Sequence, residues 1–197
     1  MLSNRARLIF RTAVLTLAGT GLVGAIVGLV VLRGGFYDIS ANTQHFPIVY
    51  KVLTQGLQYS VQRHAKDIQV PADLGGREQL LRGASLYAAN CVQCHGAPAV
   101  APLIQGMSMQ PAPGPLVDAD VNWETRELYW ITRNGIKMSG MPAWQYHLSE
   151  QEIWDVVAFV AAMPTMTPAD YRKMTRQEGV TEQALESAHT TTGREES

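Results

Sequence analysis

The sequence has little cysteine and no excess of charge of either sign. Two cysteines among 197 residues cannot build the several disulfide bridges of a small secreted scaffold. Sixteen Lys and Arg side chains stand against seventeen Asp and Glu, so the net charge is −1. A nucleic-acid-binding protein would need a basic excess to neutralise phosphates, and that class is therefore excluded. The composition is neither disordered nor collagen-like, which leaves a folded domain with attached segments.

The charges are unevenly distributed along the chain. Residues 1–76 carry seven Lys and Arg against three Asp and Glu, a net charge of +4. Residues 77–163 carry five against eight, and residues 164–197 carry four against six, so both segments are negative. The change of sign predicts a domain boundary near residue 76.

The first predicted segment is a membrane anchor within residues 1–33. From Thr12 to Leu32, 21 positions contain no charged residue. At about 1.5 Å per residue such a helix spans roughly 30 Å, the thickness of the hydrocarbon core. Three arginines precede the run and only Arg33 follows it closely, so the positive-inside rule places the N-terminus in the cytoplasm. A cleaved signal peptide is the alternative, although its apolar stretch is usually about 7–15 residues.

Residues 34–76 are predicted to be a connector. Within it, apolar residues recur at spacings of three and four after Pro47: Val49, Val52, Leu53, Leu57 and Val61. This spacing predicts an amphipathic helix over 47–65 that lies on the membrane or docks onto a partner. His45 and His64 have no neighbour at ligand spacing, so we interpret them as ordinary polar residues.

Both cysteines of the protein lie in one pentapeptide, Cys91-Val92-Gln93-Cys94-His95. Two thiols on one helical turn can form thioethers with the two vinyl groups of one haem edge, and the adjacent imidazole can then bind the iron as the proximal ligand. The motif therefore predicts one covalently attached haem c. This haem is attached on the outer side of the bacterial membrane, which is where the anchor places everything after residue 33.

Three other interpretations of the pentapeptide were considered. A structural disulfide between Cys91 and Cys94 would not need His95. A zinc site would need two further Cys or His ligands at suitable spacing, and there is no second pair. A thioredoxin-like redox pair would need a surrounding βαβ pattern, which the segment lacks.

Residues 77–163 resemble a class I, single-haem c-type cytochrome, of the kind also found in small haem-bearing subunits of bacterial terminal oxidases. Three stretches carry the resemblance: 82–87, the 91–95 motif and 134–144. The resemblance implies an all-α fold with three to four core helices around the haem, in addition to one N-terminal transmembrane helix. It also implies that Gly83 and Tyr87 let the first domain helix cross the last one closely.

The resemblance further implies a methionine as the second axial ligand of the iron. In the family this ligand precedes a proline in a Gly-Met-Pro turn, which corresponds here to Met141. Met138, three positions earlier, is the second candidate, and Met107 and Met109 are expected to fill gaps in their loop. A thioether is a soft ligand that favours ferrous iron and raises the reduction potential of the haem.

A proline-rich loop at residues 110–116 is expected to support the proximal histidine. In the family, a proline carbonyl from this loop accepts a hydrogen bond from the proximal imidazole and fixes its orientation. Pro113 is the candidate here, with Pro111 and Pro115 as alternatives.

The remaining helices are predicted from periodicity and capping signals. A helix over about 124–134 ends at Asn134-Gly135. The last domain helix begins with a capping box at Ser149–Glu152 and is stopped by Pro164. Beyond the domain, in residues 164–197, a short helix is expected over 170–176 and a disordered tail over 190–197.

These observations predict a bacterial inner-membrane cytochrome c that carries single electrons on the periplasmic face. The predicted haem-binding residues are Cys91, Cys94, His95 and Met141, the last two as iron ligands. No catalytic residue and no small-molecule substrate is expected, and the partners are the membrane and redox proteins. One alternative is a dedicated subunit of a larger membrane oxidoreductase. In that case Gly24 and Gly28, a small-xxx-small pair in the anchor, would let a helix of a partner subunit approach closely. Another is a haem enzyme with an open distal site.

Overall fold

The computed structural model describes residues 3–176, with the side chains of residues 120 and 121 left undescribed. Every regular element in this part of the chain is a helix, and the sole β-type pairing within it is a bridge between Ala97 and Val100. The predicted all-α fold is therefore confirmed. The tail predicted to be disordered, 190–197, lies outside the described residues.

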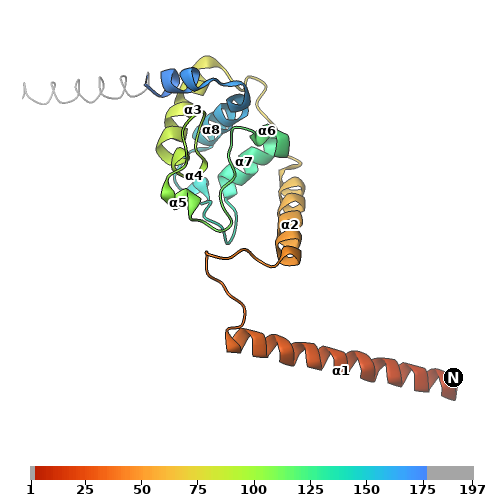
Figure 1. Cartoon of the computed structure of the whole chain (residues 1–197). Coiled ribbons are helices and arrows are strands. Elements are labelled where there is room, and N and C mark those ends of the chain that lie inside the picture. Colours follow the sequence, from red (N-terminus) through yellow and green to blue (C-terminus); the bar gives the residue numbers. More distant parts are fainter. Residues whose placement is uncertain (1–2, 177–197) are drawn as a thin grey trace, which may run out of the picture. The chain divides into compact units, whose positions relative to one another are not determined.

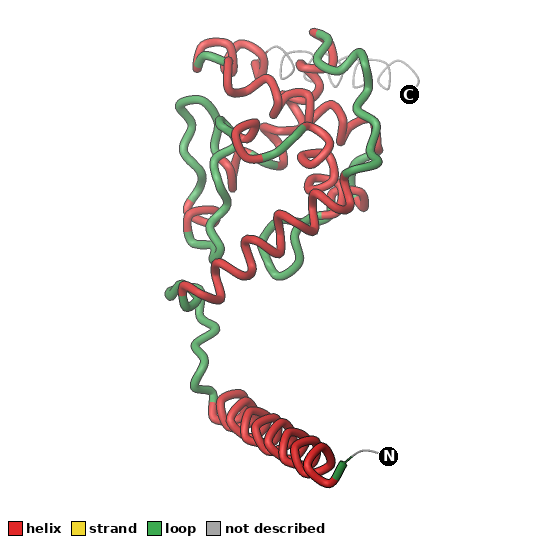
Figure 2. Tube along the Cα trace, turned by 90° about the vertical axis from the view of Figure 1, so that its right-hand side faces the viewer, coloured by secondary structure: helices red, strands yellow, loops and turns green. Residues whose placement is uncertain are grey.

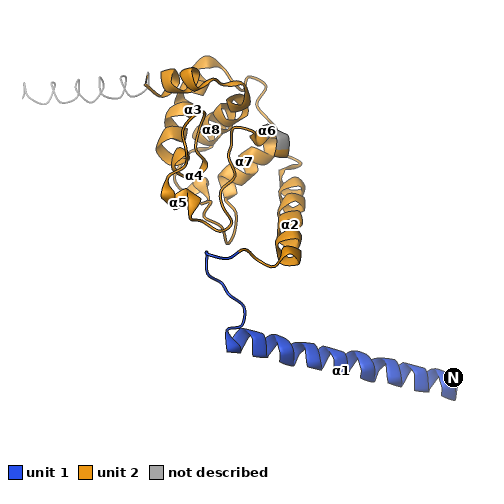
Figure 3. Ribbon diagram, in the orientation of Figure 1, with its two compact units in different colours: residues 1–43 blue, residues 44–197 orange. Residues whose placement is uncertain are grey.

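The chain divides into two compact units after Thr43 (Figure 3). The first unit contains α1 (Asn4–Gly34) and the second contains all later elements. The division falls inside the segment predicted to be a connector. Residues 44–76, most of that segment, therefore belong to the same unit as the domain that follows.

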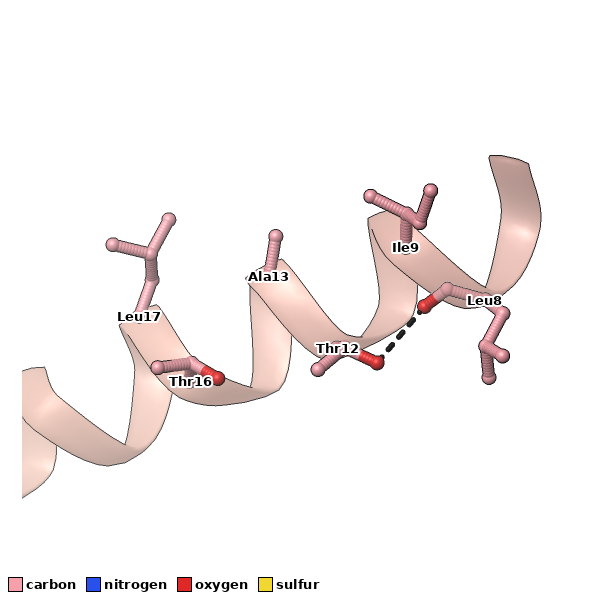
Figure 4. A pocket seen from close by; sticks show the side chains of 6 residues that line it. All are labelled: Leu8, Ile9, Thr12, Ala13, Thr16 and Leu17. Carbon is pink, nitrogen blue, oxygen red and sulfur yellow. Dashed lines mark hydrogen bonds between the residues drawn. The ribbon is translucent and has the colours of Figure 1, made fainter. Parts of the chain in front are cut away.

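Helix α1 is capped at both ends. The Ser3 side chain accepts a hydrogen bond from the Ala6 N–H at 3.3 Å, and the helix ends at Gly35, whose φ of 65° is left-handed. Among the described residues it is the one helix long and apolar enough to cross a membrane, a test that a signal sequence near the N-terminus also passes. Figure 4 shows that the Thr12 hydroxyl bonds back to the Leu8 carbonyl, at 3.0 Å, so this polar group needs no partner outside the helix.

The second unit is built from helices of very different lengths (Figures 1 and 2). Four of them are long: α2 (Pro47–Ala65), α3 (Arg77–Asn90), α7 (Thr125–Asn134) and α8 (Glu150–Ala162). Short turns connect them: α4 (Val92–His95), α5 (Ile104–Met107), α6 (Ala119–Asn122), and the 3₁₀ turns η1 (Trp144–Tyr146) and η2 (Met163–Thr165). Residues 168–176 are also helical, in agreement with the predicted short helix.

Helix α8 is the centre of the hydrophobic core. It begins at the predicted capping box, in which the Ser149 N–H donates to Glu152 Oε2 at 2.7 Å and the Glu152 N–H donates to Ser149 Oγ at 3.3 Å. All eight residues from 153 to 160 are buried, because α8 packs against both α3 and α7. The apolar residues on nearly all its sides are thereby covered.

Helices α3 and α8 cross at Gly83, as predicted. A Cβ at this position would lie only 2.1 Å from the carbonyl oxygen of Asp155, so only glycine permits the crossing. One turn further along α3, the Tyr87 ring packs against Phe159 with 5.3 Å between ring centroids. Both side chains are fully buried. Gly83 and Tyr87 thus have the role that the resemblance implied, a close crossing of the first and last helices of the domain.

An ion pair between a half-exposed arginine and a buried aspartate links α3 and α8 at the same crossing. Arg82 on α3 donates to the Asp155 carboxylate on α8 from Nε at 2.7 Å and from Nη2 at 3.2 Å, and Gln151 donates to it as well, at 3.0 Å. Burial alone would raise the pKa of Asp155. The hydrogen bonds from Arg82, Gln151 and Gln79 outweigh it, so the pKa is lowered and the carboxyl stays ionised.

Helix α2 (Pro47–Ala65) has the bounds predicted from periodicity, and its C-terminal part docks onto α7. Val61 and Ala65 are fully buried there. The His64 ring stacks on Trp130 with 5.5 Å between ring centroids, and its Nδ1 lies 2.7 Å from the Ser60 carbonyl oxygen. His64 is thus a packing residue at this contact.

Candidate haem-binding site

The Cys91–His95 motif forms the turn that follows α3. The Cys91 N–H donates to the Tyr87 carbonyl at 2.9 Å, and the His95 N–H donates to the Cys91 carbonyl at 3.0 Å. The two cysteines are therefore three residues apart on one helical turn. Neither is in a disulfide; Cys91 is buried and Cys94 is half-buried. This is the arrangement that two thioether links to one haem edge require.

The loop after the motif holds the turn in place through backbone contacts. The Leu103 N–H donates to the Gln93 carbonyl at 2.8 Å. Gly106 lies so close to the motif that a Cβ there would be 2.7 Å from Cys94 Cα. On the other side, the buried Tyr87 hydroxyl donates to the Gly96 carbonyl at 2.6 Å. The sequence analysis did not single out Gly106, because a glycine in a loop has no pattern that marks a close approach.

The proximal histidine is oriented by a backbone carbonyl, but not by the predicted one. His95 Nδ1 lies 2.8 Å from the carbonyl oxygen of Gly114, so Nδ1 carries the proton and Nε2 is the nitrogen left for a metal. The prediction that the carbonyl of Pro113, or of Pro111 or Pro115, accepts this hydrogen bond is therefore wrong. Prolines lack the N–H that would pair the backbone regularly, so their spacing does not determine which carbonyl of the loop faces the ring.

Burial shifts the pKa of both His95 and Cys91. It lowers the pKa of His95, and the bond to Gly114 acts in the opposite direction without cancelling the effect. The neutral imidazole, which is the form that binds metals, is therefore favoured. Burial, followed by the proximity of Cys94, raises the pKa of Cys91 to about 12, so this thiol stays protonated at neutral pH.

We call the segment 134–144, which contains Met138 and Met141, the methionine loop. Its two ends meet at Gly135. The φ of 68° and ψ of −174° of this glycine lie in a region that is essentially restricted to glycine, and a Cβ would meet both the Met141 carbonyl oxygen and the Pro142 carbonyl carbon at 2.7 Å. The Ile136 N–H donates to the Met141 carbonyl at 3.2 Å, and the Met141 N–H donates to Ser139 Oγ at 3.2 Å. Two hydrogen bonds thus hold the Met141 backbone on both sides of its Cα.

The two candidate methionines differ in their surroundings. The Met138 side chain is 94% exposed, and its φ of 59° is unusual for a residue with a side chain. Met141 is half-buried. Met109 packs against the loop that contains Met141: its Sδ lies 2.5 Å from the position of a Cβ placed on Gly140. Met107 is 62% exposed, so the expectation that it fills a gap in its loop is wrong.

The donor set of this region fits haem c better than a bare metal ion. Across the described residues, no three His, Cys, Asp or Glu side chains come together to hold a metal ion, so the zinc alternative lacks its further ligands. What the motif does offer is a neutral, oriented imidazole directly beside two thiols on one turn. These are the groups that attach a haem and bind its iron on one side.

Comparison with known proteins relates this region to a known family. Residues 78–160, somewhat less than half of the chain, match the family described as cytochrome C oxidase, cbb3-type, subunit III. The matched stretch includes α3, the Cys91–His95 turn, the methionine loop and nearly all of α8. No curated protein matches the chain.

Proposed function

We propose, from the premise that residues 78–160 form a c-type cytochrome domain similar to those of oxidase subunits, that this protein is a membrane-anchored carrier of single electrons facing the bacterial periplasm. Cys91 and Cys94 hold one haem c, and His95 and Met141 bind its iron. The observation that carries the proposal is the His95 imidazole within the matched region, half-buried, neutral and held through Nδ1 by Gly114.

The residues of the chain would perform three tasks. The haem, when bound, supplies a reversible one-electron couple. The Gly114 carbonyl keeps the proton of His95 on Nδ1 and presents Nε2. The Met141 backbone, held by Ile136 and Ser139, presents a thioether that favours ferrous iron. No acid–base group or substrate pocket is needed for this function.

The proposed location rests on α1. Its length and apolar composition suit a single span, and Arg5, Arg7 and Arg11 on its N-terminal side outnumber Arg33 on the other. By the positive-inside rule, the arginine-rich end stays in the cytoplasm of the cell and the cytochrome domain faces the periplasm.

A second candidate function is that of a permanent subunit of a larger membrane oxidoreductase, such as a terminal oxidase. The observation that favours it is the family match itself, because that family is named for an oxidase subunit. Purification from membranes in mild detergent separates the two: a stoichiometric partner supports the subunit, and a homogeneous monomer supports the free carrier.

The experiment that tests the proposed ligands compares Met141→Ala with Met138→Ala in the full-length protein. The parent should keep its haem on a denaturing gel and show the ferric Met–iron charge-transfer band. Met141→Ala should lose the band, bind carbon monoxide and show a markedly lower potential, because the soft ligand is gone. Met138→Ala is the matched control, since its side chain is exposed in the same loop, and it should keep the parent's spectrum.

Other outcomes assign the site differently. Loss of the band in Met138→Ala alone would identify the other sulfur as the ligand, and the carrier function would stand. A parent that lacks the band and binds carbon monoxide readily has an open distal site, which would favour the haem enzyme. Haem lost from the parent on denaturation would exclude the thioether links.

A further inference from the structure

Helix α2 has two apolar sides, and the domain covers only one of them. Leu57, Val61 and Ala65 recur every four residues, and the last two are fully buried where α2 meets α7. Figure 1 shows that the N-terminal half of α2 continues past α7. The domain therefore covers the C-terminal half of this side, whereas Tyr50 and Leu53, nearer its N-terminal end, are 46% and 55% exposed.

The other side carries Ile48, Val52 and Tyr59, which are 68%, 59% and 69% exposed. At about 100° per residue these three positions lie within about 40° of one another around the helix axis, and roughly 160° from Val61. We call them the outer face of α2. Two branched aliphatic side chains and a tyrosine aligned along one face are typical of a helix that lies in a membrane interface.

The charge of this segment favours a negatively charged surface. Helix α2 contains Lys51 and Arg63 and no Asp or Glu, and no acidic residue occurs anywhere from 39 to 66. The domain that follows, 77–163, carries five Lys and Arg against eight Asp and Glu. Among the segments outside α1, this one is thus suited to anionic lipid headgroups, which attract basic helices and repel acidic domains.

The covalent connection keeps α2 near the membrane. Only residues 35–46 separate the end of α1 from the start of α2. Twelve residues reach at most about 43 Å when fully extended, and a flexible chain of that length averages about 20 Å. Pro47 therefore stays within about 43 Å of the end of α1, and so remains close to the bilayer in which α1 is anchored.

We propose that the outer face of α2 lies in the lipid headgroup region of the anionic membrane that α1 crosses. The proposal rests on the anchoring part of the proposed function. Helix α2 then has a lipid-facing side and a domain-facing side, and its contact with α7 connects the membrane surface to the cytochrome domain.

The test uses the full-length, haem-loaded protein in vesicles of phosphatidylglycerol and phosphatidylcholine. Val52→Cys places one free thiol on the outer face, and Thr54→Cys places one two residues away on nearly the opposite side, also exposed. Each thiol is labelled with an environment-sensitive fluorophore, and vesicles containing lipids spin-labelled near the headgroup quench it. Quenching of the Val52→Cys label should exceed that of the Thr54→Cys label at least twofold, and the difference should shrink in vesicles of phosphatidylcholine alone.

The opposing outcomes are distinct. Equal quenching at both positions would overturn the proposal while leaving the anchor intact. So would a Val52→Cys thiol that is protected from labelling in native membranes yet unquenched in vesicles, because a protein partner would then cover the face. A protein that alkaline carbonate washes off the vesicles contradicts the anchor itself. Labelling of the parent, which has only Cys91 and Cys94, would instead contradict the thioether links.

Discussion

Helices α3 and α8 approach each other closely at Gly83, and this contact gives the sharpest prediction about stability. A Cβ added at this position would lie 2.1 Å from the Asp155 carbonyl oxygen, 2.7 Å from its carbonyl carbon and 2.9 Å from Phe159 Cβ. Two of these atoms are backbone atoms of α8 and the third is next to the backbone. None of them can move aside by a change of rotamer.

Gly83→Ala should destabilise the protein by about 2 kcal/mol. To reach an ordinary contact of 3.4 Å from 2.1 Å, α3 and α8 must separate locally by about 1.3 Å. Overpacking of this kind costs about 1–3 kcal/mol, and this case belongs at the upper end because the Tyr87–Phe159 contact and the Arg82–Asp155 pair loosen together. Alanine in place of glycine within a helix returns about 1 kcal/mol.

The assay is denaturant unfolding of the full-length haem-loaded protein in detergent. Gly56→Ala in α2 is the matched control, because a Cβ there would meet nothing within 4 Å, and it should be neutral or stabilising by up to about 1 kcal/mol. A Gly83→Ala protein with an unfolding midpoint equal to that of the parent, at equal haem content, would refute the reasoning.

Three further predictions concern the Arg82–Asp155 ion pair and the methionine loop. Arg82→Leu should cost about 2–3 kcal/mol by leaving the buried Asp155 carboxylate with only its glutamine donors. The pKa of Asp155 is lowered below its ordinary 3.8, so the pair stabilises the fold fully above that pH and the effect is lost as the pH falls through the lower folded-state value. The stability gap between the parent and Asp155→Asn, measured by unfolding from pH 7 to 3, should therefore be constant near neutral pH and begin to narrow below pH 3.8. Gly135→Ala should weaken the Met–iron band without loss of covalent haem, since a Cβ would displace the Met141 carbonyl; an unchanged spectrum would show that the loop position does not depend on Gly135.

The elements that sequence analysis predicted well are those determined by local signals. The period of apolar residues after Pro47 predicted α2, and the Ser149–Glu152 capping box predicted the start of α8. Gly83 and Tyr87 were found because a resemblance assigned them a role at a helix crossing, which the structure confirms. Periodicity and capping depend on neighbours within a few residues, and such neighbours are visible in a sequence.

The features that were missed depend on contacts between distant segments. Asp155 lies among apolar residues of α8, and its partner Arg82 is 73 residues away, so no local pattern pairs them. The Gly114 carbonyl was missed by one position, since a proline-rich loop can present several carbonyls. The docking of α2 onto α7 was missed because an amphipathic helix predicts a covered face but not what covers it.

The proposed haem-binding residues Cys94, His95 and Met141 share one structural feature: each has a close contact with the backbone of a glycine. Gly106 lies against the backbone of Cys94, and Gly135 lies against the Met141 carbonyl. The Gly114 carbonyl accepts a hydrogen bond from Nδ1–H of His95. Backbone hydrogen bonds and close backbone contacts allow less motion than exchangeable side-chain rotamers do. A one-electron carrier benefits from this, because ligands that keep their geometry when the iron changes charge add little to the reorganisation that electron transfer requires. An enzyme with an open distal site would have no use for a methionine loop closed this tightly, and the closure at Gly135 therefore favours the carrier.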